Sequence, residues 1–374
     1  MSSAATPDVA SAAARLRALL GDRLHEPGEP GFDTATRLWN AAVDSQPALV
    51  AHCLDADEVA AAVRVAARCH LPVSVRSGGH DWAGRALRDG GLVLDLTGLH
   101  AVRVDPDSCT VTVAGGASAA DLLAAAAPYD LVVPTGVVRD VGMAGLTLAG
   151  GYGPLCGRFG LALDNLLGAE VVLADGRRVT ADPRHDAELY WALRGGGGNV
   201  GVVTELRYRA HRLPAVLAGM IMFALAEAPA VLRGYAALLA DAPDELTVMA
   251  GFLPGPAGEP VVSCARSTAA RTWTPAARGW TGCGRWAPRW STRSTRCRTR
   301  TRCACSTAEW STVTTTCCVP AGCQRSPTAR WTRWSTPPGR SPRRSPRWPC
   351  TTSTARPPGS GSATRRSACA PSTC

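Results

Sequence analysis

Short apolar runs alternate with amphipathic segments over the first 210 residues or so. Behind Asp55 and Glu58, whose spacing resembles a capping box, alanine and valine recur at helical intervals and predict a helix over residues 57–69. Two further segments, 118–127 and 186–194, have the same helical periodicity. This part of the chain is therefore expected to contain several amphipathic helices packed on other elements.

Runs rich in valine, bounded by glycine or polar residues, predict strands between these helices. The expected strands are residues 73–76, 91–96, 110–114, 171–174, 177–181 and 202–209. Asp175-Gly176 separates two of them and suits a type I′ hairpin turn. Because helices and strands are intermixed without a regular βαβ repeat, the fold is predicted to be α+β.

The N-terminal region, residues 1–44, is expected to be a helical segment, since Ala12 to Leu20 is amphipathic. A secretory signal would need a basic start and a continuous apolar core, and no stretch reaches the roughly 18 to 20 apolar residues of a membrane span. Before residue 264 only four scattered cysteines occur: Cys53, Cys69, Cys109 and Cys156. These features predict a cytoplasmic protein without membrane contact.

Composition changes abruptly after Ser263. Residues 1–263 contain 20 Arg and 29 acidic residues, whereas residues 264–374 contain 20 Arg and a single acid, Glu309. The second region has no Leu, Ile, Met, Phe, Tyr or His, yet it holds 11 of the 15 Cys and 8 of the 11 Trp. Without aliphatic side chains it cannot fill a core, so it is not expected to form a packed domain.

Residues 264–374 allow four interpretations. A nucleic-acid-binding arm would usually mix lysine with arginine, and a zinc module would need cysteine pairs at ordered spacing. Ordinary disorder is poor in tryptophan and cysteine. Translation of a GC-rich gene out of frame explains the composition best, because one-base shifts of guessed codons restore acidic and aliphatic residues. An out-of-frame, disordered tail is the preferred hypothesis, with no specific nucleic-acid partner.

Glycine-rich loops are the main indication of chemistry. Arg76-Ser77-Gly78-Gly79-His80 directly follows a predicted strand, and successive glycines allow backbone N–H groups to form an anion-binding nest to which Arg76 can add charge. The loop matches neither the Rossmann nor the P-loop pattern. Further glycines cluster over residues 136–153 and 195–198. A long ligand with a diphosphate, such as a dinucleotide, fits contact with several such loops.

From about Trp39 to Pro214 the sequence resembles the flavin-dependent oxidoreductases of the berberine-bridge-enzyme type, whose FAD domain is shared with vanillyl-alcohol oxidases. The matching stretches are RSGGH at 76–80, PTG at 134–136, VGMAGLTLAGGYG at 141–153, GLALDN at 160–165 and LYWALRGGGGN at 189–199. The resemblance implies a PCMH-type FAD-binding domain of two α+β subdomains over residues 45–214. It also implies that residues 215–263 begin an antiparallel-sheet substrate domain.

The resemblance also implies roles for individual residues. His80 matches the histidine that the family bonds to the 8α-methyl of the flavin, and an imidazole that is neutral near its ordinary pKa is nucleophilic. No metal is expected. The residues implied in cofactor binding are Arg76, Ser77, Gly78, Gly79, His80, Gly136, Gly142, Gly145, Gly201 and Val203.

Some relatives carry a second flavin link through a cysteine shortly after the PTG motif. Val138 occupies that place here, so a single covalent bond is predicted. Cys156 lies too far along the chain to match the second attachment point. It is interpreted as a packing residue or as a contact beside the flavin.

By resemblance the reaction is oxidation of a small-molecule alcohol, sugar or natural-product hydroxyl, with hydride transfer to flavin and dioxygen as the final acceptor. No catalytic base can be assigned, because nothing in the spacing marks any tyrosine of the first 263 residues. Two functions therefore stay open. One is a covalent-flavin oxidase, and the other is a truncated, catalytically inactive FAD-binding remnant.

Overall fold

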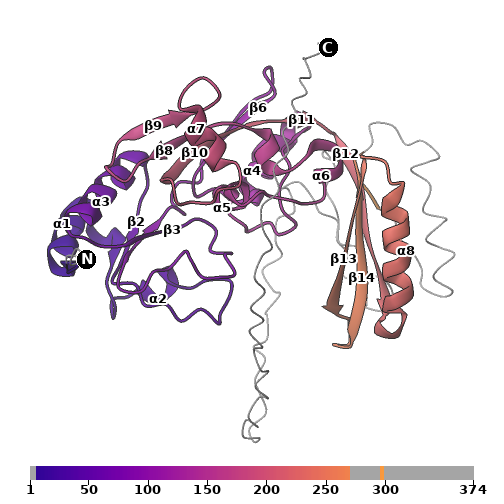
Figure 1. Ribbon diagram of the computed structural model, residues 1–374, viewed down its shortest axis with the longest axis horizontal. Helices are drawn as coiled ribbons and strands as arrows, with labels where there is room; N and C mark the ends of the chain where they lie inside the picture. The colour runs from indigo at the N-terminus through magenta and orange to yellow at the C-terminus, as the bar shows by residue number, and fades with distance from the viewer. Residues whose placement is uncertain (1–5, 270–294, 299–374) are drawn as a thin grey trace, which may run out of the picture. The chain divides into compact units, whose positions relative to one another are not determined.

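The computed structural model describes residues 6–269 and 295–298 (Figure 1). The chain divides into two compact units, Met1–Gln324 and Arg325–Cys374, and every described residue belongs to the first. Residues 270–294 and 299–374 of the expected tail lie outside the described residues. The hypothesis that the tail is read out of frame concerns these residues as well.

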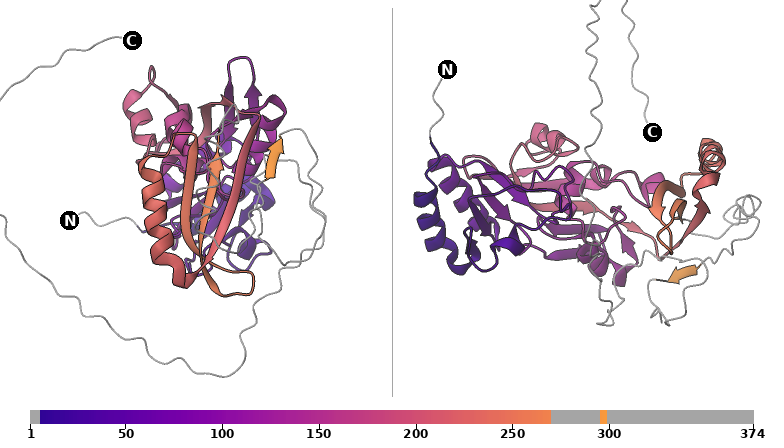
Figure 2. Two further views of the ribbon diagram at one scale, coloured as in Figure 1. Left: turned by 90° about the vertical axis from the view of Figure 1, so that its right-hand side faces the viewer. Right: turned by 90° about the horizontal axis from the view of Figure 1, so that it is seen from below.

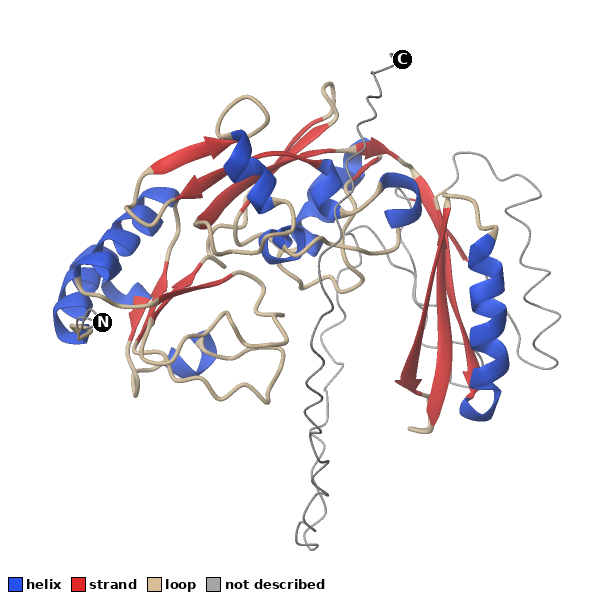
Figure 3. Cartoon of the chain, in the orientation of Figure 1, coloured by secondary structure: helices blue, strands red, loops and turns tan. Residues whose placement is uncertain are grey.

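The first sheet has the strand order β1-β2-β4-β3. Strand β4 (Leu92–Asp95) runs parallel to β2 (Leu49–His52) and to β3 (Val73–Arg76), and β1 (Leu24–His25) pairs antiparallel with β2. Helices α1 (Val9–Leu20) and α3 (Ala56–Arg68) lie side by side against this sheet (Figure 3). The short helix α2 (Phe32–Ala35) follows β1. The first 44 residues thus contribute both a helix and an edge strand to this layer.

Helix α3 forms as its pattern predicts. The Asp55 side chain accepts a hydrogen bond from the Glu58 backbone N–H, 2.8 Å away, and caps the helix. The Glu58 carboxylate binds the N–H of Leu54 rather than that of Asp55, so the reciprocal half of the capping box is displaced by one residue. The valines and alanines of α3 pack with leucines of α1 and of the sheet into one buried core.

The second sheet is antiparallel, with the order β5-β6-β10-β8-β9. Its strands are β5 (Val102–Asp105), β6 (Thr110–Ala114), β8 (Leu166–Val172), β9 (Arg178–Ala181) and β10 (Val202–Arg209). Helices α4 (Ala119–Ala126), α5 (Met143–Leu148) and α7 (Ala187–Leu193) accompany it, and residues of α4 and α5 pack into its core. Short elements complete this part: β7 (Leu131–Val132), α6 (Cys156–Phe159), β11 (His211–Arg212) and the 3-10 turns Ala127–Tyr129 and Ala162–Asn165. Another 3-10 turn, Gly21–Arg23, joins α1 to β1 of the first sheet. The predicted α+β class is confirmed.

The hairpin between β8 and β9 forms, but the predicted type I′ turn is wrong. The N–H of Gly176 bonds the carbonyl of Leu173, and the N–H of Leu173 bonds the carbonyl of Arg177. Gly176 has φ +79°, whereas Asp175 is not among the residues with positive φ. A type I′ turn needs positive φ at both central residues. The loop is therefore a three-residue connection in which glycine takes the left-handed position.

A third sheet follows with the order β13-β14-β12-β15. It contains β12 (Ala215–Ala224), β13 (Leu246–Pro254), β14 (Pro260–Thr268) and β15 (Thr295–Arg298), all antiparallel. After the 3-10 turn Leu225–Glu227, helix α8 (Ala228–Ala240) lies along one face of the sheet (Figures 1 and 2). Phe223, Ala228 and Val262 form the small core between helix and sheet.

The expected boundary after Ser263 falls inside strand β14. Residues 264–268 pair with both β12 and β13, and residues 295–298 pair with β12. These two segments differ from the expectation of disorder. Ladder hydrogen bonds are made by backbone groups, which every residue except proline provides, so the composition of a short segment does not prevent it from pairing.

Candidate functional site

The loop with the sequence RSGGH leaves strand β3 at Arg76, at the carboxyl end of the parallel strands. The hydrogen bonds among the described residues use none of the backbone N–H groups of Gly78, Gly79 and His80. Gly79 has φ +68°, a conformation that side chains rarely allow. A run of free N–H groups beside a left-handed glycine has the chemistry of an anion-binding nest.

Gly142 packs directly against this loop. A methyl group placed on Gly78 would collide with the backbone nitrogen of Gly142, and one on Gly142 would collide with the Ser77 hydroxyl. Ser77 Oγ donates to the carbonyl of Gly115, 2.9 Å away. A methyl group on Gly115 would in turn collide with the carbonyl of Val203 in β10. The structure therefore brings Ser77, Gly78, Gly115, Gly142 and Val203 together from four segments.

Gly136 reaches the same region through helix α5. A Cβ on Gly136 would lie 3.3 Å from the Leu146 side chain, and one on Gly153 would collide with the carbonyl of Thr135. Gly145, in α5, is exposed and has no atom within 4 Å of where its Cβ would be. Gly201 packs against Val171, with 2.6 Å between its Cβ position and Val171 Cγ1. Gly145 thus borders open space, while Gly136 and Gly201 fill packing positions.

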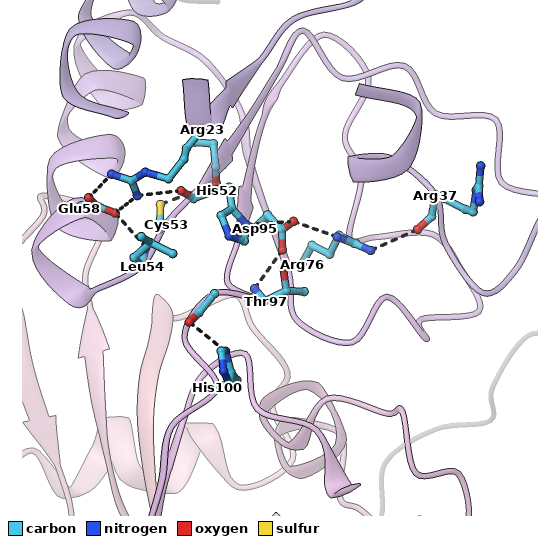
Figure 4. Close-up of polar contacts among 12 residues, drawn as sticks. Arg23, Arg37, His52, Cys53, Leu54, Glu58, Arg76, Asp95, Thr97 and His100 are labelled. Carbon is cyan, nitrogen blue, oxygen red and sulfur yellow. Dashed lines mark hydrogen bonds and ion pairs between the residues drawn. The ribbon is translucent and has the colours of Figure 1, made fainter. Parts of the chain in front are cut away.

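Arg76 has a different partner from the one expected. Its Nη1 donates to the Asp95 carboxylate at 2.9 Å, and its Nη2 lies 3.4 Å from the carbonyl of Arg37 (Figure 4). Asp95 is only 4% exposed and also accepts the N–H of Thr97, with His52 Nδ1 3.6 Å away. The Arg76 charge is therefore balanced inside the protein. This geometry favours a role in fixing the loop over one in holding a phosphate.

His80 is half-buried beside Trp39. Their ring centroids are 5.8 Å apart and the planes are inclined by 22°, which is a stacked arrangement. Burial lowers the pKa of His80 below its ordinary value, and the carboxylate of Asp140 acts weakly in the opposite direction. A lowered pKa keeps the imidazole neutral at neutral pH, as a nucleophile requires.

Val138 and Cys156 are the two residues that bear on a second covalent bond to the flavin. Val138 is exposed in the segment after the PTG motif. The Cys156 thiol accepts a hydrogen bond from the Gly153 N–H at 2.9 Å, and burial raises its pKa. Cys156 therefore helps to hold the glycine turn at the end of the 141–153 motif.

Three of the tyrosines have structural partners. The Tyr208 hydroxyl is buried 2.6 Å from Thr147 Oγ1, that of Tyr190 donates to the carbonyl of Leu166 at 2.7 Å, and that of Tyr235 donates to the carbonyl of Val248 at 3.2 Å. Tyr129 and Tyr152 are exposed. No tyrosine is thereby identified as a base.

Asp95, Trp39 and Asn40 also belong to this region, although no motif indicated them. A carboxylate at the end of the apolar run LVLD could have drawn attention to Asp95, because a buried charge requires a partner. Nothing local indicates that Trp39 and Asn40 meet a loop some forty residues further along the chain.

Comparison with known proteins shows what this part of the chain is similar to. A family model described as FAD binding domain matches residues 47–182. (R)-6-hydroxynicotine oxidase from Paenarthrobacter nicotinovorans is 41% identical over 223 residues, which cover 59% of this chain and 48% of the relative. Glucooligosaccharide oxidase from Sarocladium strictum is 35% identical over 199 residues, which cover 52% and 39%. The chain spans about half the length or less of the curated relatives it matches.

Solved structures of similar fold point to the same group of proteins. The crystal structure of 6-hydroxy-D-nicotine oxidase from Arthrobacter nicotinovorans superposes with a TM-score of 0.62 and 35% identity, covering 66% of this chain and 55% of that one. BBE-like 1 from Physcomitrella patens gives a TM-score of 0.70 and 25% identity, covering 76% and 62%. These findings confirm the resemblance seen in the glycine motifs. Residues 47–182 match an FAD-binding domain, and the chain is similar in sequence to FAD-linked oxidoreductases and in structure to a BBE-like protein.

Proposed function

We propose that FAD binds across the loops at 76–80, 136–145 and 201–203 and is bonded covalently to His80. The observation that carries this proposal is the loop after β3. No described residue accepts a hydrogen bond from the backbone N–H groups of Gly78, Gly79 and His80, and Gly78 packs against Gly142. Free N–H donors complement a diphosphate. The open space at Gly145 leaves room for a ligand next to the same segment. The residues present therefore fit the cofactor that the family model names.

His80 is the attachment residue in this proposal, and Val138 limits the attachment to one bond. The pKa of His80 lies below its ordinary value, so the unprotonated ring nitrogen is available at neutral pH. Bound FAD supplies a hydride acceptor whose electrons can pass to dioxygen, and covalent attachment raises its oxidising power. Asp95 and Arg76 hold the end of β3 from which the loop departs.

The substrate is proposed to be a small molecule that loses hydride from the carbon next to a hydroxyl. The relative named as a glucooligosaccharide oxidase supports this class. The proposed domains are a flavin domain over residues 45–214 and the start of a substrate domain from residue 215, where strand β12 begins. Among the described residues, no helix is both long enough and apolar enough to cross a membrane.

Acid precipitation of the purified full chain tests the cofactor assignment. Flavin fluorescence should stay with the wild-type pellet, should be lost from the pellet of His80→Ala, and should be kept by His100→Ala, which changes an exposed histidine outside the site. Flavin found only in the wild-type supernatant would leave FAD binding intact and reject the covalent bond. Absence of flavin from both fractions would reject the proposal.

A second candidate is a chain that binds FAD without turning over substrate. The coverage of the relatives favours it, because residues 45–214 contain the flavin loops whereas about half of each relative has no counterpart here. Peroxide release separates the two. Peroxide that depends on a hydroxynicotine or an oligosaccharide supports the oxidase, whereas flavin-loaded protein that is silent with both supports the inactive form.

A further inference from the structure

A short segment, residues 37–40, runs alongside the loop that carries His80. The carbonyl of Arg37 lies 3.4 Å from Arg76 Nη2, at the start of the loop. At the other end, Asn40 Nδ2 donates to the carbonyl of Trp82 at 2.8 Å. The two segments are about forty residues apart in sequence, so these contacts exist only in the folded chain.

The middle of the segment contacts the glycine next to His80. The backbone N–H of Trp39 donates to the carbonyl of Gly79 at 3.0 Å. The Leu38 side chain is buried, and its Cδ2 lies 3.4 Å from the Cβ position of Gly79. Gly79 is therefore held by a hydrogen bond and by packing, although its own left-handed backbone gives it conformational freedom.

The Trp39 ring stacks on the His80 ring and contacts Trp82, with centroids 5.8 Å and 5.5 Å away respectively. Trp39 is 58% exposed and Trp82 is 76% exposed. Large aromatic rings that remain this exposed contribute little to a core, so burial does not explain their position. Trp39 instead contacts the one ring that the proposed function requires to be fixed, and Trp82 contacts Trp39.

We propose that residues 37–40 are a positioning segment that holds the His80 ring in the orientation needed for flavin attachment, with Trp39 and Asn40 as its principal residues. The inference rests on the proposed function. Attachment replaces one C–H bond of the flavin 8α-methyl by a C–N bond to the imidazole. The imidazole N–H bond is broken as well, and the two protons and two electrons released from the C–H and N–H bonds reduce dioxygen to hydrogen peroxide. The reacting nitrogen must face that carbon, and a free glycine-rich loop would rarely hold it there.

Trp39→Ala in the full chain separates positioning from folding. The substitution keeps the backbone N–H and removes only an exposed ring. After FAD is added to flavin-free protein, covalent attachment should become about tenfold slower, while the affinity for FAD before attachment changes little. Trp39→Phe, which restores a stacking ring, should recover most of the rate. Phe252→Ala is the matched control, because Phe252 is 60% exposed on β13.

Asn40→Asp tests the other end of the segment. It keeps the oxygen that accepts the Ala42 N–H at 3.1 Å and removes the donor to the carbonyl of Trp82. Attachment should again slow. Attachment at the wild-type rate in Trp39→Ala, or a parallel loss of attachment and of FAD affinity, would overturn the positioning role.

Amide exchange of the flavin-free chain keeps this test separate from that of the proposed function. The N–H of residue 39 is bonded to Gly79, so Asn40→Asp should speed its exchange if the segment holds the loop. Unchanged exchange would contradict the inference even if wild-type protein takes up no FAD. Covalent flavin in His80→Ala would reject His80 as the attachment residue. The exchange result would still show whether residues 37–40 hold the loop.

Discussion

Gly78 and Gly142 meet backbone to backbone, although 64 residues separate them in sequence. A methyl group on Gly78 would collide with the nitrogen of Gly142, and one on Gly142 would lie 2.5 Å from the nitrogen of Gly78. Neither glycine has a positive φ. Space, rather than backbone conformation, therefore requires glycine at both positions. Two motifs that the sequence offers only as cofactor loops are also each other's packing partners.

Alanine at either position should destabilise the folded chain. Each methyl group would collide with the backbone nitrogen of the other glycine, which cannot rotate away, so each substitution should lower the free energy of unfolding by about 1–3 kcal/mol. Urea denaturation measures this. Gly234→Ala is the control: its Cβ would meet open space on α8, so it should be neutral or stabilising by up to about 1 kcal/mol. A Gly78→Ala midpoint equal to that of the wild type would contradict the packing.

Local patterns predicted the elements well and their contacts poorly. Strands 73–76, 110–114 and 202–209 have the bounds expected from valine-rich runs between polar residues, because strand propensity acts over neighbouring positions. The Gly78–Gly142 contact depends on chain topology, which no local pattern encodes. The turn at Gly176 differs because one glycine suits either turn type.

In the candidate site, too, local motifs were predicted and contacts between distant segments were not. The glycines and His80 were identified because their motifs are contiguous, whereas the partner of Arg76 was missed. Asp95 lies on the neighbouring strand, and the pairing of Arg76 with Asp95 is set by the parallel register of β3 and β4. Strand order could not be inferred from the sequence, so the charge on Arg76 was expected to face a phosphate.

Removal of the Asp95 carboxylate should be costly. Asp95→Asn leaves the largely buried Arg76 guanidinium without its counter-charge, and loss of one partner from such a pair lowers stability by roughly 3 kcal/mol. The exposed pair of Arg103 and Glu205 provides the comparison, since Glu205→Gln should change stability by less than about 1 kcal/mol. Thermal or urea unfolding of both variants checks this, and equal effects would show that burial of Asp95 has no energetic consequence.

Gly145→Ala should separate folding from ligand binding. Its added methyl group meets no protein atom and replaces glycine within α5, so the flavin-free chain should be unchanged or more stable by up to about 1 kcal/mol. If FAD occupies the space beside Gly145, the same methyl group should weaken its binding. A titration followed by flavin fluorescence measures the affinity. Wild-type affinity in this variant would place the cofactor away from Gly145.

Acid should weaken the link between α3 and the first sheet. Arg23 binds the Glu58 carboxylate with two 2.6 Å hydrogen bonds (Figure 4), and this contact, together with the Leu54 N–H, lowers the pKa of Glu58 despite partial burial. A carboxylate whose folded pKa is lowered adds stability above its unfolded pKa, near 4.3. That stability is lost as pH falls through the lower folded value.

Urea midpoints of wild type and Glu58→Gln should therefore differ most at pH 7 and converge as pH falls below about 4. Replacement of Arg23 by methionine in both backgrounds provides the control, because it removes the largest cause of the lowered pKa. In that background the difference between glutamate and glutamine should depend much less on pH. A wild-type excess over Glu58→Gln that persists undiminished at pH 3 would mean that the Arg23–Glu58 contact does not depend on the carboxylate charge.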